Sequence, residues 1–269
     1  MNRFRILQSH PDRLSYFIFA LYLALYPGTL FAVVFAVVPA NGAIFGGVLL
    51  ALQGLSIAAW LYSGLGRRAW VVIVGILVGS CVVEYVGATY DIPFGAYDYT
   101  EQLGYRVVST VPAVILLAWL FSTVGTWAAA YVIAPHAPRV VRAALAGLFI
   151  VFFDLQIEPV ATIIHQYWVW IDRGWYYGVP WVNFAGWWLT GTIFAYLFDT
   201  YFIARLRTVV SPHPLPFWHL FVCMGLFFAM NGRAGLWLAA TLSVLGMIGI
   251  VFLQTRWVAV TQAHRHEIV

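Results

Sequence analysis

The chain has 269 residues, of which 63% are hydrophobic and 9% are charged, and its mean hydropathy is +0.86. This composition lies far outside the range of soluble domains and indicates a polytopic membrane protein. The formal net charge of +4 comes from arginine, because lysine is absent, and no basic run with interleaved aromatic residues points to a nucleic-acid partner. The lack of lysine also excludes a retinal Schiff base and a lysine nucleophile.

Eight apolar segments follow one another along the chain, each near the roughly 20 residues needed to cross a hydrocarbon core. The first is longer than a signal-peptide core and is expected to remain in the mature protein. We therefore predict an all-α fold, a transmembrane helical bundle of about eight spans that forms a single domain over residues 1–269. The segments are 14–38, 44–63, 70–88, 108–134, 140–164, 182–204, 216–230 and 234–257.

Arginines divide unevenly between alternate connections. Eleven lie on the side of the two termini, and three (Arg106, Arg173 and Arg233) lie on the other side. Because cytoplasmic loops are enriched in arginine, both termini are predicted to be cytoplasmic, in a multi-pass protein of the cell membrane.

The sequence lacks the motifs of nucleotide-binding, metal-dependent and prenyl-transfer proteins. No P-loop or Gly-x-Gly-x-x-Gly is present, the seven histidines form no repeated His-x3-His pattern, and no Asp-rich pair suits magnesium diphosphate. Cys81 and Cys223 have no metal-ligand spacing and are interpreted as packing residues. We therefore expect neither a cofactor nor a metal site.

Four acidic residues lie inside predicted spans, where ionisable groups are costly and are candidates for function. Two of them have simpler explanations. Glu84 lies near the outer end of the third segment, where interfacial solvation is an alternative. Asp199 is expected to form an inner-leaflet ion pair with Arg205 or Arg207, or a packing hydrogen bond.

Asp154 and Glu158 are four residues apart and so share one helix face. Because two neighbouring carboxylates cannot both ionise cheaply in an apolar medium, the pair is expected to retain a proton, as a general acid requires. Pro159 lacks a backbone N–H and should free the Leu155 carbonyl as an acceptor. His165 lies two turns further along the same face. A mutually hydrogen-bonded structural pair is the alternative.

Aromatic residues make up 18% of the chain and crowd two outward connections, 89–106 and 165–184. Membrane-interface belts account for part of this excess. The remainder suggests an apolar tunnel whose ring faces stabilise a passing cation. An acid, such a tunnel and no cofactor together suggest protonation of a carbon–carbon double bond in a lipid.

Four stretches stand out together: "EYVGATYDIPFGAYDYTEQLG" (84–104), "VP" (111–112), "DLQIEPVA" (154–161) and "WVWIDRGWYYGVPWVNFAGWW" (168–188). They resemble the integral-membrane carotenoid hydratases, the family of the gamma-carotene 1',2'-hydratase and bisanhydrobacterioruberin hydratase type. The resemblance covers about residues 70–190. It implies addition of water to the terminal double bond of an acyclic carotenoid end, a hydro-lyase reaction that needs no cofactor.

The expected mechanism follows from the acid and the resemblance together. Glu158 or Asp154 protonates C2, a tertiary cation forms at C1, and Glu84 or the second carboxylate orients the water. The residues expected to bind substrate are Asp91, Phe94, Tyr97, Tyr99, His165, Trp168, Tyr176, Tyr177, Asn183 and Trp187. Of these, Asn183 and the four tyrosines are predicted to line a cavity reached from the acyl region.

The carotenoid itself, water and membrane lipids are the expected partners, with association with other carotenoid enzymes possible and no nucleic acid. Gamma-carotene or lycopene is the first expectation for the substrate, and bisanhydrobacterioruberin is the alternative. Cyclisation or isomerisation of the same carotenoid end would share the protonation step. A proton-coupled transporter would also need buried carboxylates, although no internal repeat supports that interpretation.

The arginine pattern makes a prediction about topology. Accessibility tags at residues 66, 137 and 210 should be cytoplasmic, and tags at 41, 98 and 173 should be external. Reversed labelling of either set would contradict the eight-span arrangement.

Overall fold

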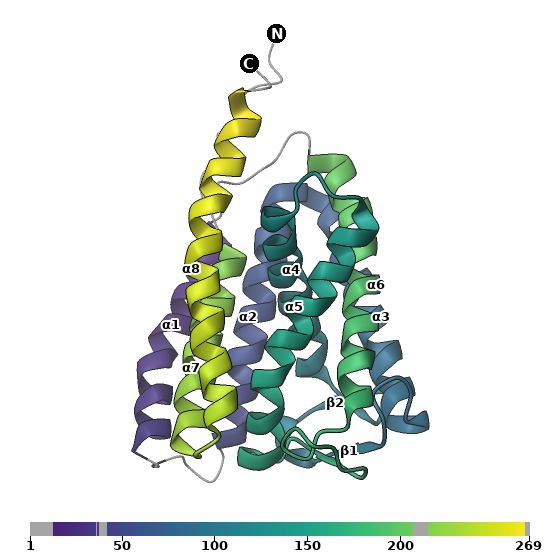
Figure 1. The fold of residues 1–269 in the computed structure, drawn as a ribbon, viewed down its shortest axis with the longest axis vertical. Helices are drawn as coiled ribbons and strands as arrows, with labels where there is room; N and C mark the ends of the chain where they lie inside the picture. Colours follow the sequence, from purple (N-terminus) through teal and green to yellow (C-terminus); the bar gives the residue numbers. More distant parts are fainter. Residues whose placement is uncertain (1–12, 36, 38–41, 207–214, 267–269) are drawn as a thin grey trace.

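Eight α-helices coincide with the eight predicted apolar segments in the computed structural model, which describes residues 13–35, 37, 42–206 and 215–266. Figure 1 shows them as a bundle of roughly parallel and antiparallel helices. The helices are α1 (Arg13–Val34), α2 (Gly42–Leu65), α3 (Ala69–Tyr90), α4 (Ala113–Ile133), α5 (Arg139–Pro159), α6 (Trp181–Leu206), α7 (Leu215–Arg233) and α8 (Trp237–His266).

Length and hydropathy mark six stretches of the described residues as candidate membrane spans. One of them, Phe45–Tyr90, joins α2 and α3 through the 3₁₀ turn Gly66–Arg68, whereas α6 is not among the six. The prediction of an all-α, polytopic transmembrane bundle is confirmed. The count of eight spans and the cytoplasmic side of the termini stay predictions.

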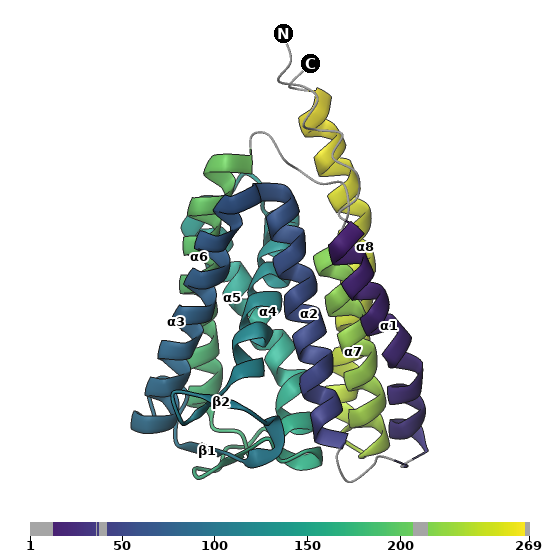
Figure 2. The same ribbon diagram turned by 180° about the vertical axis from the view of Figure 1, so that it is seen from behind.

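Helix α4 forms the centre of the bundle. It contacts α2, α3, α5, α6, α7 and α8, and most of its side chains are buried. Figures 1 and 2 place α1, α7 and α8 on one side of the molecule and α3 and α6 on the other. A close approach of α4 to α7 requires Gly125, because a Cβ there would lie 2.9 Å from Leu220.

The connections separate to the two ends of the bundle. The α2–α3 and α4–α5 connections lie at one end, and the aromatic-rich connections lie at the other (Figure 1). Residues 66 and 137 are therefore at the end opposite 98 and 173, as the arginine pattern predicts. The remaining tag positions, 41 and 210, are outside the described residues.

Short strands that periodicity did not predict lie in the two aromatic-rich connections and just after the first of them. Strand β1 (Tyr97–Tyr99) pairs antiparallel with β4 (Trp168–Trp170), and β2 (Arg106–Val107) pairs with β3 (Val111–Pro112). The 3₁₀ turn Glu101–Leu103 lies between β1 and β2, and a π-helical turn, Val160–Ile164, follows α5. The β1–β4 pair joins connections about 70 residues apart in the sequence and lies across this end of the bundle.

At the opposite end, α5 and α6 are joined by a buried ion pair. The Arg142 Nη2 atom lies 2.6 Å from Asp199 Oδ2, and the Trp127 indole donates to Asp199 Oδ1 at 2.9 Å. The Nη1 atom of Arg142 donates to three carbonyls of the α4–α5 connection, those of Ala134, Pro135 and Ala137. Since both groups are buried, loss of either one would leave the charge of the other without a counter-charge.

The predicted ion pair of Asp199 is therefore present, and Arg142 is its partner in the described part of the chain. The side chains of the predicted partners, Arg205 and Arg207, lie outside the described residues. Sequence proximity did not point to Arg142, which is at the start of α5 and lies beside α6 in space.

We predict that Asp199→Ala lowers the free energy of unfolding by about 3–5 kcal/mol, because it leaves the Arg142 guanidinium buried without its counter-charge. Denaturation of the purified protein in detergent measures this effect. In the Arg142→Ala/Asp199→Ala double variant the loss should be smaller than the sum of the single losses. Additive losses would show that the two charges do not interact.

Candidate active site

Strands β1 and β4 form a two-stranded ribbon, the β1–β4 ribbon, with aromatic residues at alternate positions. Tyr97 lies opposite Trp170 and Tyr99 lies opposite Trp168, with ring centroids 5.3 and 6.0 Å apart. Because successive side chains of a strand point to opposite faces, these four rings share one face. The residues between them are exposed on the other face. The ribbon therefore presents four polar hydrogen donors, two phenols and two indoles, toward the helices.

The two tyrosines of the ribbon hold Glu84. Their hydroxyls donate to Glu84 Oε2, at 2.9 Å from Tyr97 and 2.7 Å from Tyr99, and the Trp119 indole donates to Oε1 at 2.6 Å. Burial and the neighbouring carboxylate raise the pKa of both tyrosines, which therefore remain protonated donors. Glu84 is only 3% exposed. Glu84 is therefore buried and hydrogen-bonded to three protein groups, and the alternative that it is solvated at the membrane interface does not apply.

The two tryptophans of the same ribbon hold Glu158. Their indoles donate to Glu158 Oε2, at 2.9 Å from Trp170 and 3.3 Å from Trp168. The Asn183 amide of α6 donates to the other oxygen at 3.0 Å. Strand β1 thus supplies two donors for Glu84, and β4 supplies two donors for Glu158. Because the strands are paired, the ribbon fixes the positions of the two carboxyls relative to each other.

Asn183 also connects Glu158 to Asp154. Its Nδ2 atom donates to Asp154 Oδ2 at 3.0 Å as well, so both amide hydrogens are engaged by neighbouring carboxyls. The other Asp154 oxygen is buried and has no hydrogen-bond partner among the described residues. The predicted pairing of Asp154 and Glu158 on one helix face is present, with a bridging amide between them.

Pro159 shapes the chain beside this pair. Lacking an N–H, it cannot donate to the Leu155 carbonyl, and the Tyr176 hydroxyl donates to that carbonyl instead. The helix continues as a π-helical turn, and the backbone N–H of Tyr167 donates to the Ala161 carbonyl at 2.7 Å. The predicted free carbonyl is confirmed. After this turn and hydrogen bond the chain enters β4, whose Trp168 and Trp170 indoles donate to Glu158.

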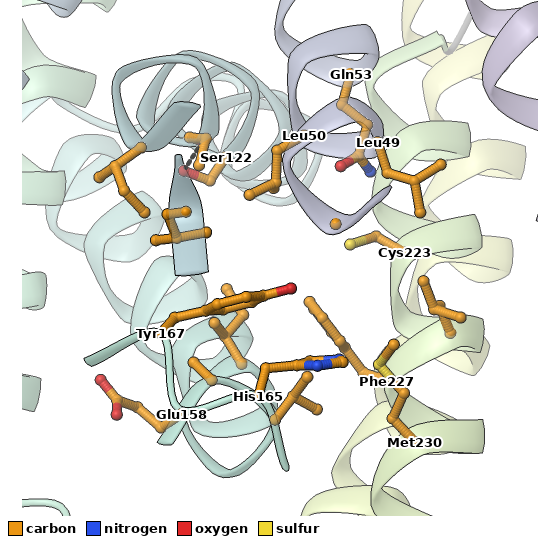
Figure 3. Close-up of a pocket in the computed structure, with 18 of the residues that line it drawn as sticks. Leu49, Leu50, Gln53, Ser122, Glu158, His165, Tyr167, Cys223, Phe227 and Met230 are labelled. Atoms are coloured by element: carbon orange, nitrogen blue, oxygen red, sulfur yellow. Dashed lines mark hydrogen bonds between the residues drawn. The ribbon is translucent and has the colours of Figure 1, made fainter. Parts of the chain in front are cut away.

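A cavity of about 470 Å³ lies beneath the ribbon, and its volume is typical of ligand sites, which span about 300–1,000 Å³. Figure 3 shows Glu158, His165 and Tyr167 at its wall. Most of the wall is apolar. The predicted site residues that line it are Glu84, Phe94, Tyr97, Tyr99, Glu158, His165, Trp168, Asn183 and Trp187.

Ring faces surround the part of the cavity near Glu84. Trp119 and Trp187 stack with centroids 4.2 Å apart and an interplanar angle of 16°, and Phe94 contacts both rings. Trp119, Tyr167 and Trp170 line the cavity but were not among the predicted residues. Trp119 lies in the middle of an apolar segment and carries no sequence signal of its own, whereas Trp170 could have been inferred from its alternation with Trp168.

Four predicted residues lie outside the cavity lining. Asp154 is fully buried behind Glu158, and Asp91 is exposed at the end of α3 in a left-handed conformation. Tyr176 is directed at the Leu155 carbonyl, and Tyr177 packs edge-on against Tyr176. The prediction that Tyr176 and Tyr177 line the cavity is therefore not met. Tyr176 instead donates to the freed Leu155 carbonyl, and Tyr177 packs against the Tyr176 ring.

His165 stacks on Tyr167 with ring centroids 5.0 Å apart. Burial lowers the pKa of His165, so its imidazole is neutral at pH 7, and burial raises the pKa of Tyr167 to about 12. Within the part of the chain that the structure describes, no group of three or more His, Cys, Asp or Glu side chains is arranged to hold a metal ion. The stacked pair therefore acts as a flat, uncharged wall of the cavity.

This geometry defines a class of protein: a membrane-embedded helical bundle in which hydrogen-bonded carboxyls face an apolar, aromatic cavity. Residues 45–250 match the carotenoid biosynthesis protein family, and the chain belongs to that family. A bisanhydrobacterioruberin hydratase from Haloarcula japonica is 27% identical over 147 residues, 54% of this chain and 50% of that protein. The chain thus spans about half the length of this curated relative. No solved structure matches the chain.

We predict that Tyr176→Phe destabilises the protein by about 1–3 kcal/mol, because it leaves the Leu155 carbonyl without a donor. Tyr177→Phe is the matched control, since it removes the neighbouring hydroxyl but not this hydrogen bond. Thermal unfolding in detergent measures both variants. Equal stability of the two would contradict the role given to Tyr176.

Proposed function

We propose that the protein is a carotenoid hydratase that adds water to the terminal C1=C2 double bond of an acyclic carotenoid end. The observation that carries the proposal is that Glu84 and Glu158 line one apolar cavity while the same ribbon holds them both. The named hydratase among its relatives supports the reaction type. Addition of water exchanges no electrons, so these residues and one water suffice for it.

Glu158 is the proton donor in this proposal. It faces the cavity, whereas Asp154 lies behind it and shares the Asn183 amide with it. Two carboxyls held by one amide in a buried site cannot both carry a charge cheaply, so the pair holds a proton. Glu158 delivers this proton to C2 of the alkene, and the electron pair of the double bond forms the new C–H bond. Asp154 is a positioning residue that keeps its neighbour protonated.

The resulting tertiary cation at C1 is stabilised by ring faces. Trp119, Trp187 and Phe94 line the cavity and pack against one another, so a positive carbon there can lie against the aromatic surface that they turn toward the cavity.

Glu84 is the base in this proposal. Its two oxygens accept hydrogen bonds from three donors, which hold the carboxyl in place and stabilise it when it is ionised. It orients a water toward C1 and accepts its proton as the C–O bond forms. One proton has then left Glu158, one has arrived at Glu84, and the elements of water have been added to the alkene.

Expression in a lycopene-accumulating bacterium tests the reaction directly. The extracted pigment should gain the mass of one water, or of two where both ends react. A new pigment of unchanged mass would instead indicate cyclisation or isomerisation of the same end. An unaltered pigment would contradict hydration of this class of substrate.

The role of the acid is tested by carboxamide variants, which keep shape but cannot donate a carboxyl proton. We predict that Glu158→Gln lowers the hydration rate by about 10²- to 10⁴-fold or more, because an alkene is a very weak base. Asp154→Asn should lose less, and Asp199→Asn, at the far end of the bundle, should keep most of its activity. Equal rates for wild type and Glu158→Gln, at matched protein levels, would refute the assignment.

A further inference from the structure

The cavity continues past the carboxyls to the side of the bundle formed by α1. Residues from the second half of this helix line it, among them Ala24, Leu25, Gly28 and Ala32. Ala24 and Gly28 are exposed, and Leu25 is 40% exposed on the surface of the bundle. A residue that both lines the cavity and is exposed marks the place where the cavity opens outward.

Helix α1 packs against α7 through three aromatic side chains. Phe19 and Tyr22 contact the ring of His219, and the Tyr26 hydroxyl lies over Gly225. Just beyond these contacts there is open space, since a Cβ built at Gly28 meets no heavy atom within 4 Å. The opening therefore lies beside the second half of α1, toward the end of the bundle that carries the β1–β4 ribbon (Figure 2).

The walls of this opening suit an apolar chain. Leu49 and Leu50 from α2 and Phe227 and Met230 from α7 line it, and the carboxyl groups among the described lining residues of the cavity are those of Glu84 and Glu158. Figure 3 shows the His165 and Tyr167 rings between Glu158 and these α7 side chains. A flat, apolar molecule that extends from the carboxyls toward α1 would pass along the faces of these two rings.

We propose that this opening is a lateral portal through which the long polyene chain of the substrate enters from the membrane, and in which the chain stays while its end reacts. The inference rests on the proposed function and specifies its substrate: a carotenoid longer than the cavity, with one end at the carboxyls and the remainder in lipid. The portal explains how a molecule that is insoluble in water reaches buried acids in a closed bundle.

A side chain added at Gly28 tests the portal. Gly28→Phe should fill the opening without straining the helix, and Gly249→Phe on α8 is the matched control, because Gly249 also has no atom within 4 Å and does not line the cavity. In proteoliposomes that contain lycopene, Gly28→Phe should lower kcat/KM for hydration by about tenfold or more, while Gly249→Phe stays near wild type.

Quenching of tryptophan fluorescence by lycopene separates the portal from the reaction. Wild type and Gly249→Phe should be quenched, and Gly28→Phe should not. Quenching with this pattern but without any hydration would support the portal and contradict the proposed function. Equal quenching of the two variants would overturn the portal, and no quenching of wild type would overturn both proposals.

A block introduced after folding removes misfolding as an explanation. The activity of Gly28→Cys and of Gly249→Cys is measured before and after reaction with a bulky, membrane-soluble maleimide, which should lower the activity of Gly28→Cys and leave that of Gly249→Cys unchanged. The wild type, with its own Cys81 and Cys223, is labelled in parallel. Equal activity of the two labelled variants would contradict the portal.

Discussion

Burial of carboxyl groups is the constraint on which the rest of this structure depends. An isolated carboxylate in an apolar bundle is costly unless hydrogen donors surround it. The β1–β4 ribbon meets this requirement for two carboxyls at once, since the phenols of Tyr97 and Tyr99 serve Glu84 and the indoles of Trp168 and Trp170 serve Glu158. Because all four donors belong to aromatic side chains, the same groups that satisfy the acids also provide apolar ring surface.

The surrounding elements keep the ribbon in register with the helices. Pro159 and the π-helical turn reverse the chain after α5, and Tyr176 satisfies the carbonyl that the proline frees. Asn183, near the start of α6, joins the two acids of α5. A change at any of these positions would therefore alter the direction or the protonation of Glu158.

Hydropathy was sufficient to predict the helices, because the need to cross an apolar layer sets both their length and their composition. The spacing of Asp154 and Glu158 and the missing N–H of Pro159 likewise have local consequences, which the structure shows. Pairings between distant segments could not be predicted in this way. The β1–β4 pairing, the Trp119 hydrogen bond to Glu84 and the choice of Arg142 as the partner of Asp199 all depend on how helices pack.

The central claim is that a carboxyl proton and one water are added across the terminal alkene. Incubation of the membrane-embedded protein with lycopene in water labelled with deuterium and oxygen-18 tests this claim most directly, by NMR and mass analysis of the product. The account predicts one deuterium at C2 and one labelled oxygen at C1, with neither label incorporated by Glu158→Gln. Conversion of lycopene without oxygen incorporation, or oxygen incorporation without deuterium at C2, would contradict it.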